Sequence, residues 1–295
     1  VQTRKKRLKQ NRRLTMKAIY KKEVKSYLTS MIGYVFIFFI LLLEGIYFTA
    51  YNLQNAYPLF GTTLSAITFI FLILVPVLTM KTIAEERKQK TDQLLLTAPV
   101  SVSEIVLGKF LAVATVYAIP VVIICLYPLI MGKYGTVSYG MAYTAVLGFA
   151  LLGFAQIAVG VFWSSVTENP VIAAVVTFIV LFVCYMITGI GSLIPDSSMA
   201  SLACYMLLVL LAAVWIYHMI RNLWIAAVIG IAGEAALAIT YVVKSTLFEG
   251  SIQKFLAVFD ITSHFDNFTN GILDLQGVVY FLSVIIIFLV LTVQT

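Results

Sequence analysis

The segment AEERKQKTDQLLLTAPVSVSEIVLGKF, residues 84–110, carries eight charged side chains and lies between two long apolar runs, 59–80 and 111–131. A helix needs about 20 apolar residues to cross a hydrocarbon core of roughly 30 Å, and both runs meet that length. The whole chain of 295 residues is 61% hydrophobic and 11% charged, whereas soluble domains are about 45–50% apolar and about 25% charged. The sequence therefore predicts a membrane protein with a charged segment held between two membrane spans.

Continuous apolar runs predict an all-α polytopic membrane protein with about eight transmembrane helices, within a range of six to eight. Strands of a membrane barrel would alternate apolar and polar residues over about 10 positions, and these runs do not alternate. Together the runs form a transmembrane domain over 31–294. The expected spans are 31–51, 59–80, 111–131, 139–163, 170–190, 201–217, 222–243 and 278–294.

The distribution of positive charge orients the chain. With the N-terminus in the cytoplasm, the segments predicted on the inner side hold seventeen of the 20 Lys and Arg residues. Only Lys133, Lys244 and Lys254 fall on the outer side. Because cytoplasmic loops carry an excess of Lys and Arg, both termini and the charged segment 81–110 are expected in the cytoplasm.

The basic N-terminal region divides at Met16, which can open the native chain. Residues 1–15 are expected as a basic leader that is disordered or not native. Residues 16–30 carry apolar side chains near one face and lysines elsewhere, which is typical of an amphipathic interfacial helix on the inner leaflet. The alternative is a positive flank that only orients the first span. Membrane lipids, and no nucleic acid, are the expected partner of this charge.

The predicted outer loop 244–277 is unusually apolar. Its stretch SIQKFLAVFDITSHFDNFTNGILDL, 251–275, spaces apolar residues in a way that favours short helices. Such helices can dip into the outer leaflet, so the loop is expected to be an outer re-entrant segment.

The charged segment itself is predicted to fold as helix, tight turn and helix. Residues 85–90 extend the second span as a polar helix, and QLLLTAPVS, 93–101, supplies a short apolar turn ended by Pro99. Ser101 or Ser103 can cap a new helix, whose Glu104 favours its N-terminus. Three consecutive leucines in the turn suit a groove on a cytoplasmic partner better than they suit a solvated loop.

The same residues resemble the signature AEER…GTxELLLTxPVS…EIVxGK of ABC-2 type permeases, in the gliding-motility and multicopper-maturation branch. The matching residues are Ala84 to Arg87, Thr91 to Thr97, Pro99 to Ser101, Glu104 to Val106, and Gly108 with Lys109. GVFWSSVTENPVIAA, 160–174, resembles the family's SSLTEN element, and HFDNFTNGILDLQGVVYFLS, 264–283, resembles the element before its last span. The chain departs from the signature at Lys90, where Gly is common, and at Gln93, where Glu is usual.

The resemblance implies the permease subunit of an ATP-binding-cassette exporter in a prokaryotic cytoplasmic membrane. It implies that loop 84–101 is a coupling helix on a separate ATPase subunit and that a second permease copy or homologue completes the path. The residues implied to couple to the ATPase are Glu85, Glu86, Arg87, Thr91, Leu94, Leu95, Leu96, Thr97 and Pro99. Those implied at an outer gate are His264, Phe265, Phe268 and Gly271.

The chain itself is predicted to bind neither ATP nor a metal, and not to be an enzyme. A phosphate-binding loop ending at Lys109 needs Gly at 103 and Ser or Thr at 110, where Ser103 and Phe110 stand. ATP and Mg are therefore expected on the partner ATPase.

Two acidic residues lie inside predicted spans, Glu44 in LLLEGIYF and Glu234 in IAGEAALA. Intramembrane acids mark transport paths or proton relays, which makes both candidates for a translocation path. The alternative role is a carboxyl that holds helices together. A second function rests on the same residues, that of a proton- or ion-coupled secondary transporter. An intramembrane enzyme is disfavoured, because the two histidines, His218 and His264, are predicted on opposite sides.

Overall fold

The computed structural model describes residues 2–91 and 100–295, and every regular element within these ranges is a helix. Within these described residues, seven helices are long and apolar enough to cross a membrane, and a helix pair bent by 116° is an eighth candidate. The seven are Met31–Gln54, Phe60–Lys88, Val102–Met131, Tyr139–Val166, Pro170–Ser192, Ser198–His218 and Leu275–Gln294. The predicted all-α polytopic fold with up to eight spans is confirmed.

The third span is longer than its predicted range of 111–131. Its helix α6 (Val102–Ile124) begins directly after Ser101 and is followed by the short helix α7 (Tyr127–Met131). Ser101 is the N-cap, and its backbone N–H donates to Glu104 Oε2 at 3.2 Å. Of the two caps that the sequence offered, Ser101 is therefore the one used.

The chain folds as two compact units. The first combines residues 1–182 with 261–295, and the second consists of residues 183–260. The boundary between them falls inside the helix α9 (Pro170–Ser192).

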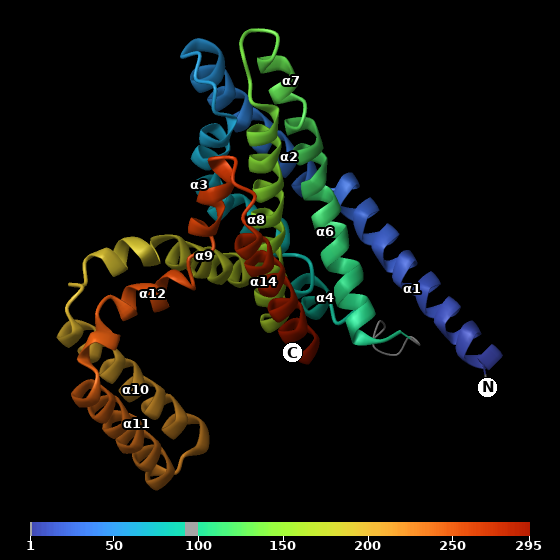
Figure 1. The fold of residues 1–295 in the computed structure, drawn as a ribbon. Helices are drawn as coiled ribbons and strands as arrows, with labels where there is room; N and C mark the ends of the chain where they lie inside the picture. Colours follow the sequence, from blue (N-terminus) through green and yellow to red (C-terminus); the bar gives the residue numbers. More distant parts are fainter. Residues whose placement is uncertain (1, 92–99) are drawn as a thin grey trace. The chain divides into compact units, whose positions relative to one another are not determined.

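In the first unit, α8 (Tyr139–Val166) packs against α3 (Phe60–Thr79), α6 and α14 (Leu275–Gln294), as Figure 1 shows. Glycines of α8 face the side chains of its neighbours: Gly148 lies against Phe268, Gly153 against Tyr117 and Gly160 against Thr79. Small residues at such contacts let membrane helices approach closely. α8 is thus the buried centre of this unit.

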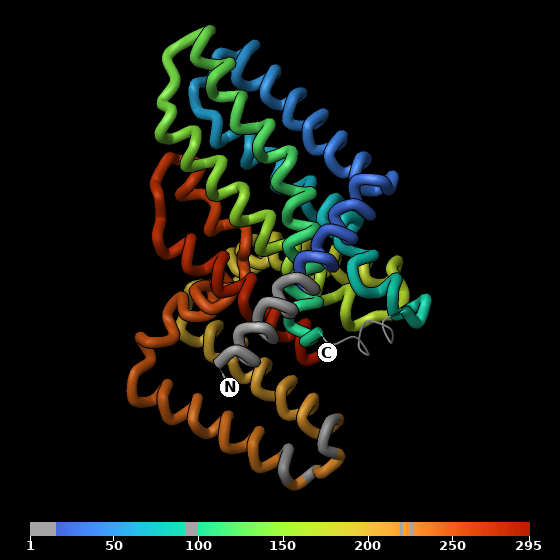
Figure 2. Tube along the Cα trace, turned by 90° about the vertical axis from the view of Figure 1, so that its right-hand side faces the viewer, coloured from blue at the N-terminus to red at the C-terminus, as the bar shows by residue number. Residues whose placement is uncertain are grey.

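The N-terminal helix α1 (Gln2–Thr29) packs along α6, and Figure 2 shows both from the side. Gly108 permits this approach, because a Cβ there would lie 3.3 Å from Ile19 Cγ2 and 3.5 Å from Met16 O. The helix runs through Met16, and the division between a leader, 1–15, and an interfacial helix, 16–30, stays a prediction. One face of α1 thus packs on protein.

The first span, α2 (Met31–Tyr47), continues into the π-helix η1 (Phe48–Gln54), which the sequence did not predict. Asn52 holds it: its Nδ2 donates to Tyr57 O at 2.7 Å, and its Oδ1 accepts from Thr63 Oγ1 at 2.5 Å. π-helical turns are rare and are frequently found at functional sites.

The second unit is built on the helix pair α10 (Ser198–Ile220) and α11 (Leu223–Val243), joined through Arg221 at φ 54°. The short helices η2 (Ser245–Phe248) and α12 (Ser251–Ala257) follow and pack on α10. The predicted span 222–243 corresponds to α11, whose part Ala227–Val243 forms the bent pair with these short helices.

The rest of the predicted outer segment belongs to the first unit. η3 (Ser263–Phe265) and α13 (Asp266–Thr269) pack on α8, and α13 also contacts α3. Short helices therefore occupy 244–277, and part of their apolar surface is covered by protein rather than by lipid.

Candidate functional site

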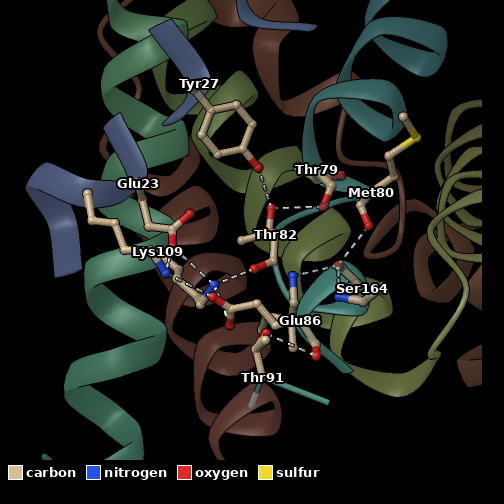
Figure 3. Close-up of polar contacts among 12 residues, drawn as sticks. Glu23, Tyr27, Thr79, Met80, Thr82, Glu86, Thr91, Lys109 and Ser164 are labelled. Carbon is tan, nitrogen blue, oxygen red and sulfur yellow. Dashed lines mark hydrogen bonds and ion pairs between the residues drawn. The ribbon is translucent and has the colours of Figure 1, made fainter. Parts of the chain in front are cut away.

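The centre of the candidate site is Lys109 of α6, a lysine whose side chain is only 2% exposed. Its Nζ lies 2.8 Å from Glu86 Oε2, 2.6 Å from Thr82 O and 3.5 Å from Glu23 Oε1 (Figure 3). An ammonium group has three N–H donors, so these three acceptors satisfy it without water. Removing one partner of a buried ion pair costs about 3–5 kcal/mol, which makes Glu86 and Lys109 strongly dependent on each other.

The three acceptors come from three different parts of the chain. Glu23 lies in α1, Thr82 in the turn after α3, and Glu86 in the short helix α4 (Ala84–Lys88). Both carboxylates are largely shielded, with 12% and 16% of the Glu23 and Glu86 side chains exposed. Lys109 thus joins α1, α4 and the α3–α4 turn to α6.

The turn before α4 is fixed by Ser164, at the end of α8. Ser164 Oγ accepts from the backbone N–H groups of Ile83 at 3.0 Å and Ala84 at 3.1 Å, and it donates to Met80 O at 3.1 Å. The first N–H groups of a helix have no partner inside the helix. Ser164 therefore caps α4 from a different helix, within the SSVTEN stretch.

Two exposed lysines, Lys22 and Lys81, lie beside this buried centre. Lys22 Nζ lies 3.6 Å from Glu86 Oε1 and 3.8 Å from Glu23 Oε1, but 67% of its side chain is exposed. Lys81 Nζ lies 3.3 Å from Oε2 of Glu85, four residues further along the chain. Exposed pairs of this kind contribute about 0–1 kcal/mol, so the buried lysine dominates the cluster.

Residues 44–293 match the family model described as ABC-2 family transporter protein. The chain belongs to the ABC-2 transporter family. A search of curated proteins finds no match. Membership makes the chain a multi-pass membrane permease, a transport component rather than itself a catalyst, and implies partnership with an ATPase subunit.

In this permease, part of the predicted coupling set lies at the cluster. Glu86 contacts Lys109, Thr91 Oγ1 donates to Glu86 O at 3.4 Å, and Arg87 Nη2 donates to Thr295 O at 3.1 Å. Glu85 is half-buried and pairs with Lys81. Leu94, Leu95, Leu96, Thr97 and Pro99 lie outside the described residues.

Five residues of the cluster were not predicted as site residues. They are Glu23, Tyr27, Thr82, Lys109 and Ser164. Lys109 and Ser164 stand in stretches that resemble the family signature, and that position was the available signal. Nothing in the local sequence pattern indicates that Glu23, Tyr27 or Thr82 would meet them.

The two intramembrane acids belong to different units. Glu44 lies in α2 and is fully buried, and neither of its carboxylate oxygens has a hydrogen-bond partner among the described residues. Glu234 lies in α11, and its oxygens are likewise buried without a partner in the described part of the chain. Glu234 also lines a groove of about 590 Å³ between α10 and α11.

The four predicted gate residues come together around α13. Phe265 and Phe268 are fully buried in the first unit, and Gly271 adopts φ 77° beside Met141. The His264 ring stacks on Tyr280, with ring centroids 3.7 Å apart.

Asp274 closes this outer segment. It caps α14 by accepting from Gln276 N at 2.9 Å, and Asn267 Nδ2 donates to its Oδ2 at 2.8 Å. The hydrogen bond from Asn267 lowers the pKa of Asp274 from its ordinary value. Across residues 2–91 and 100–295, no group of three or more His, Cys, Asp or Glu is placed to hold a metal ion.

Proposed function

We propose that this ABC-2 permease is the membrane subunit of an exporter driven by a separate ATPase that docks on loop 84–101. The observation that carries the proposal is the buried contact of Glu86 with Lys109 at 2.8 Å. It fixes α4, the described part of that loop, to the third span. A segment that receives force from a partner needs a firm attachment to the helices it moves, and a buried ion pair supplies one.

We also propose the assembly that the resemblance to ABC-2 permeases implies. Two permeases, either two copies of this chain or a pair of homologues, enclose the path in a prokaryotic cytoplasmic membrane. The ATPase binds ATP and Mg, and both permease termini lie on the ATPase side. The branch with the gliding-motility and multicopper-maturation permeases is supported by the AEER, SSVTEN and HFDNF stretches.

The outer segment is proposed as the gate. Phe265 and Phe268 plug the first unit against α8, and the stacked pair of His264 and Tyr280 ties this plug to α14. Gly271 allows the turn after α13, because its positive φ is unfavourable for residues with a side chain.

The decisive experiment is purification of the full chain in mild detergent, with mass spectrometry of the co-purifying subunits. Arg87→Ala combined with Lys88→Ala is the informative variant, since neither residue contacts buried Lys109. Glu86→Ala is less suitable, because it also leaves the Lys109 ammonium without its closest partner. Lys133→Ala, at the opposite end of α6 and α7, is the matched control.

We expect a stoichiometric ATPase with the wild-type chain and with Lys133→Ala, and a several-fold loss with the Arg87 and Lys88 variant. Equal recovery of the ATPase with all three proteins would overturn docking at this loop. The absence of any ATPase, in several detergents, would overturn the proposed function.

A second candidate is favoured by Glu44, a buried carboxyl without a partner in the described residues. Ionised carboxylates at membrane depth cost several kcal/mol, and such groups often carry protons in transporters. A secondary transporter that uses Glu44, with Glu234 as a second site, is therefore the alternative. Glu44→Gln removes the ionisable proton and keeps the shape. Proton uptake by vesicles holding the purified chain alone, lost in Glu44→Gln, would support this alternative over an ATP-driven permease.

A further inference from the structure

We infer that Lys109 is a positioning residue that locks α1, α4 and α6 into one moving body, so that a displacement of α4 is carried into both longer helices. The source of that displacement, an ATPase on α4, rests on the proposed function. The linkage itself is a property of the permease alone.

The first support is the geometry at the ammonium. Lys109 belongs to α6, and its closest carboxylate, Glu86, belongs to α4. Its second carboxylate, Glu23, belongs to α1. With 2% of the Lys109 side chain exposed, water has little access to the ammonium group while the helices stay packed. Moving one of the three elements away leaves a buried charge without a partner, whereas moving all three together does not.

The second support is independent of charge. α1 is held at two further points, one on each side of Glu23 along the helix. Tyr20 OH lies 3.0 Å from Thr115 Oγ1 of α6, and Tyr27 OH lies 3.0 Å from Thr82 Oγ1 of the α3–α4 turn. α1 is therefore tied to α6 and to the turn that leads into α4, with the Lys109 cluster between the two ties.

Lys22 provides an internal comparison. It also approaches Glu86, at 3.6 Å, and it also links α1 to α4. Its side chain is 67% exposed, so water and salt can replace the contact. If burial is what makes the linkage firm, Lys109 carries it and Lys22 does not.

The test is hydrogen exchange with mass spectrometry on the full chain in lipid nanodiscs. Glu86→Gln perturbs α4 while leaving α1 unchanged in sequence. We expect it to raise the exchange of amides in 16–29 about tenfold, because local opening of α1 becomes easier. In a Lys109→Met background the same change is expected to add less than about twofold, since the link is already cut.

Lys22→Gln is the matched control and is expected to leave exchange in 16–29 within about twofold of the wild type. If Lys109→Met does not fold, the background Lys109→Met with Glu23→Gln removes one buried acid as well. An effect of Glu86→Gln confined to 80–91 would overturn the linkage. So would an effect on α1 that persists undiminished without Lys109, or one that Lys22→Gln reproduces.

A second arm adds the co-purifying ATPase with ATP and vanadate. In the wild type we expect a change of exchange in α4 and α1 together, and in Lys109→Met a change in α4 only. If no ATPase binds the wild type, the proposed function fails, while the variant cycle still decides whether Lys109 links the three helices.

Discussion

The phenol oxygen of Tyr27 lies 3.0 Å from the hydroxyl oxygen of Thr82, in a buried contact between α1 and the turn that follows α3. Thr82 Oγ1 donates its single proton to Thr79 O at 2.8 Å. It therefore accepts from Tyr27, which fixes the direction of this hydrogen bond. The end of α1 is thus joined to the same turn whose carbonyl contacts Lys109.

Tyr27→Phe is expected to lower the free energy of unfolding by about 1 kcal/mol, because it removes a buried hydrogen bond and leaves the rest of the ring in place. Tyr20→Phe is the matched control, since it deletes the equivalent bond to Thr115 in a half-buried position. Thermal unfolding in one detergent, compared for both variants, measures the difference. A smaller loss for Tyr27→Phe than for Tyr20→Phe would contradict the assignment.

The stability of the permease should fall at alkaline pH through the same residue. Burial raises the pKa of Tyr27 well above its ordinary value of 10.0. The folded state therefore keeps a proton that the unfolded state releases, so this stability is present below pH 10.0 and is lost as pH rises above it. The melting temperature of the wild type should drop more steeply above this pH than that of Tyr27→Phe. If the melting temperatures of the two proteins fell in parallel above pH 10.0, Tyr27 would not be the cause of the alkaline destabilisation.

Ser164→Ala should destabilise the junction of α3, α4 and α8. The change leaves the N–H groups of Ile83 and Ala84 without their acceptor, and buried groups without a partner cost about 1–3 kcal/mol each. We expect Ser164→Ala to lower the free energy of unfolding by about 2 kcal/mol. Ser283→Ala is the control, because that exposed hydroxyl donates to Val279 O of its own helix. Equal melting temperatures for the two variants would argue against the cap.

Replacing two glycines of α8 by alanine should change the free energy of unfolding in opposite directions. A Cβ at Gly160 would overlap Thr79 Oγ1, so Gly160→Ala must push α3 away and is expected to cost about 1–3 kcal/mol. A Cβ at Gly140 meets nothing within 4 Å, so Gly140→Ala should gain up to about 0.5 kcal/mol through the better helix propensity of alanine. Melting of both variants under one condition tests the pair. A stabilising Gly160→Ala would show that the helices are less tightly packed.

The spans could be predicted from the sequence because each one is a continuous apolar run, which is recognised from its own residues alone. The cap of α6 could be predicted for the same reason, as Ser101 and Glu104 are near neighbours. The cluster at Lys109 has no such local sign. Its partner Glu23 lies on a different helix, far away in the sequence, and only packing brings the two together. The bend between α11 and the short helices after it, and the π-helix after α2, depend on tertiary contacts in the same way.

The packing of the outer segment also could not be predicted from the sequence. The apolar spacing in 251–275 predicted short helices but suggested lipid as their surroundings. In the structure, Phe265 and Phe268 are buried in protein. Gly148 and Gly277 face the Phe268 ring, and glycines alone do not indicate which ring they will receive.

The order of the residues around Lys109 bears on how the chain is made. Glu23 and Glu86 both precede Lys109, so the ribosome has released both carboxylates before the lysine emerges. Chains fold from the N-terminus during synthesis, and burying a lysine without a counter-charge is costly. The carboxylates of Glu23 and Glu86 are therefore available when α6 is made, and the junction can close before the α14 helix that covers α8 is translated.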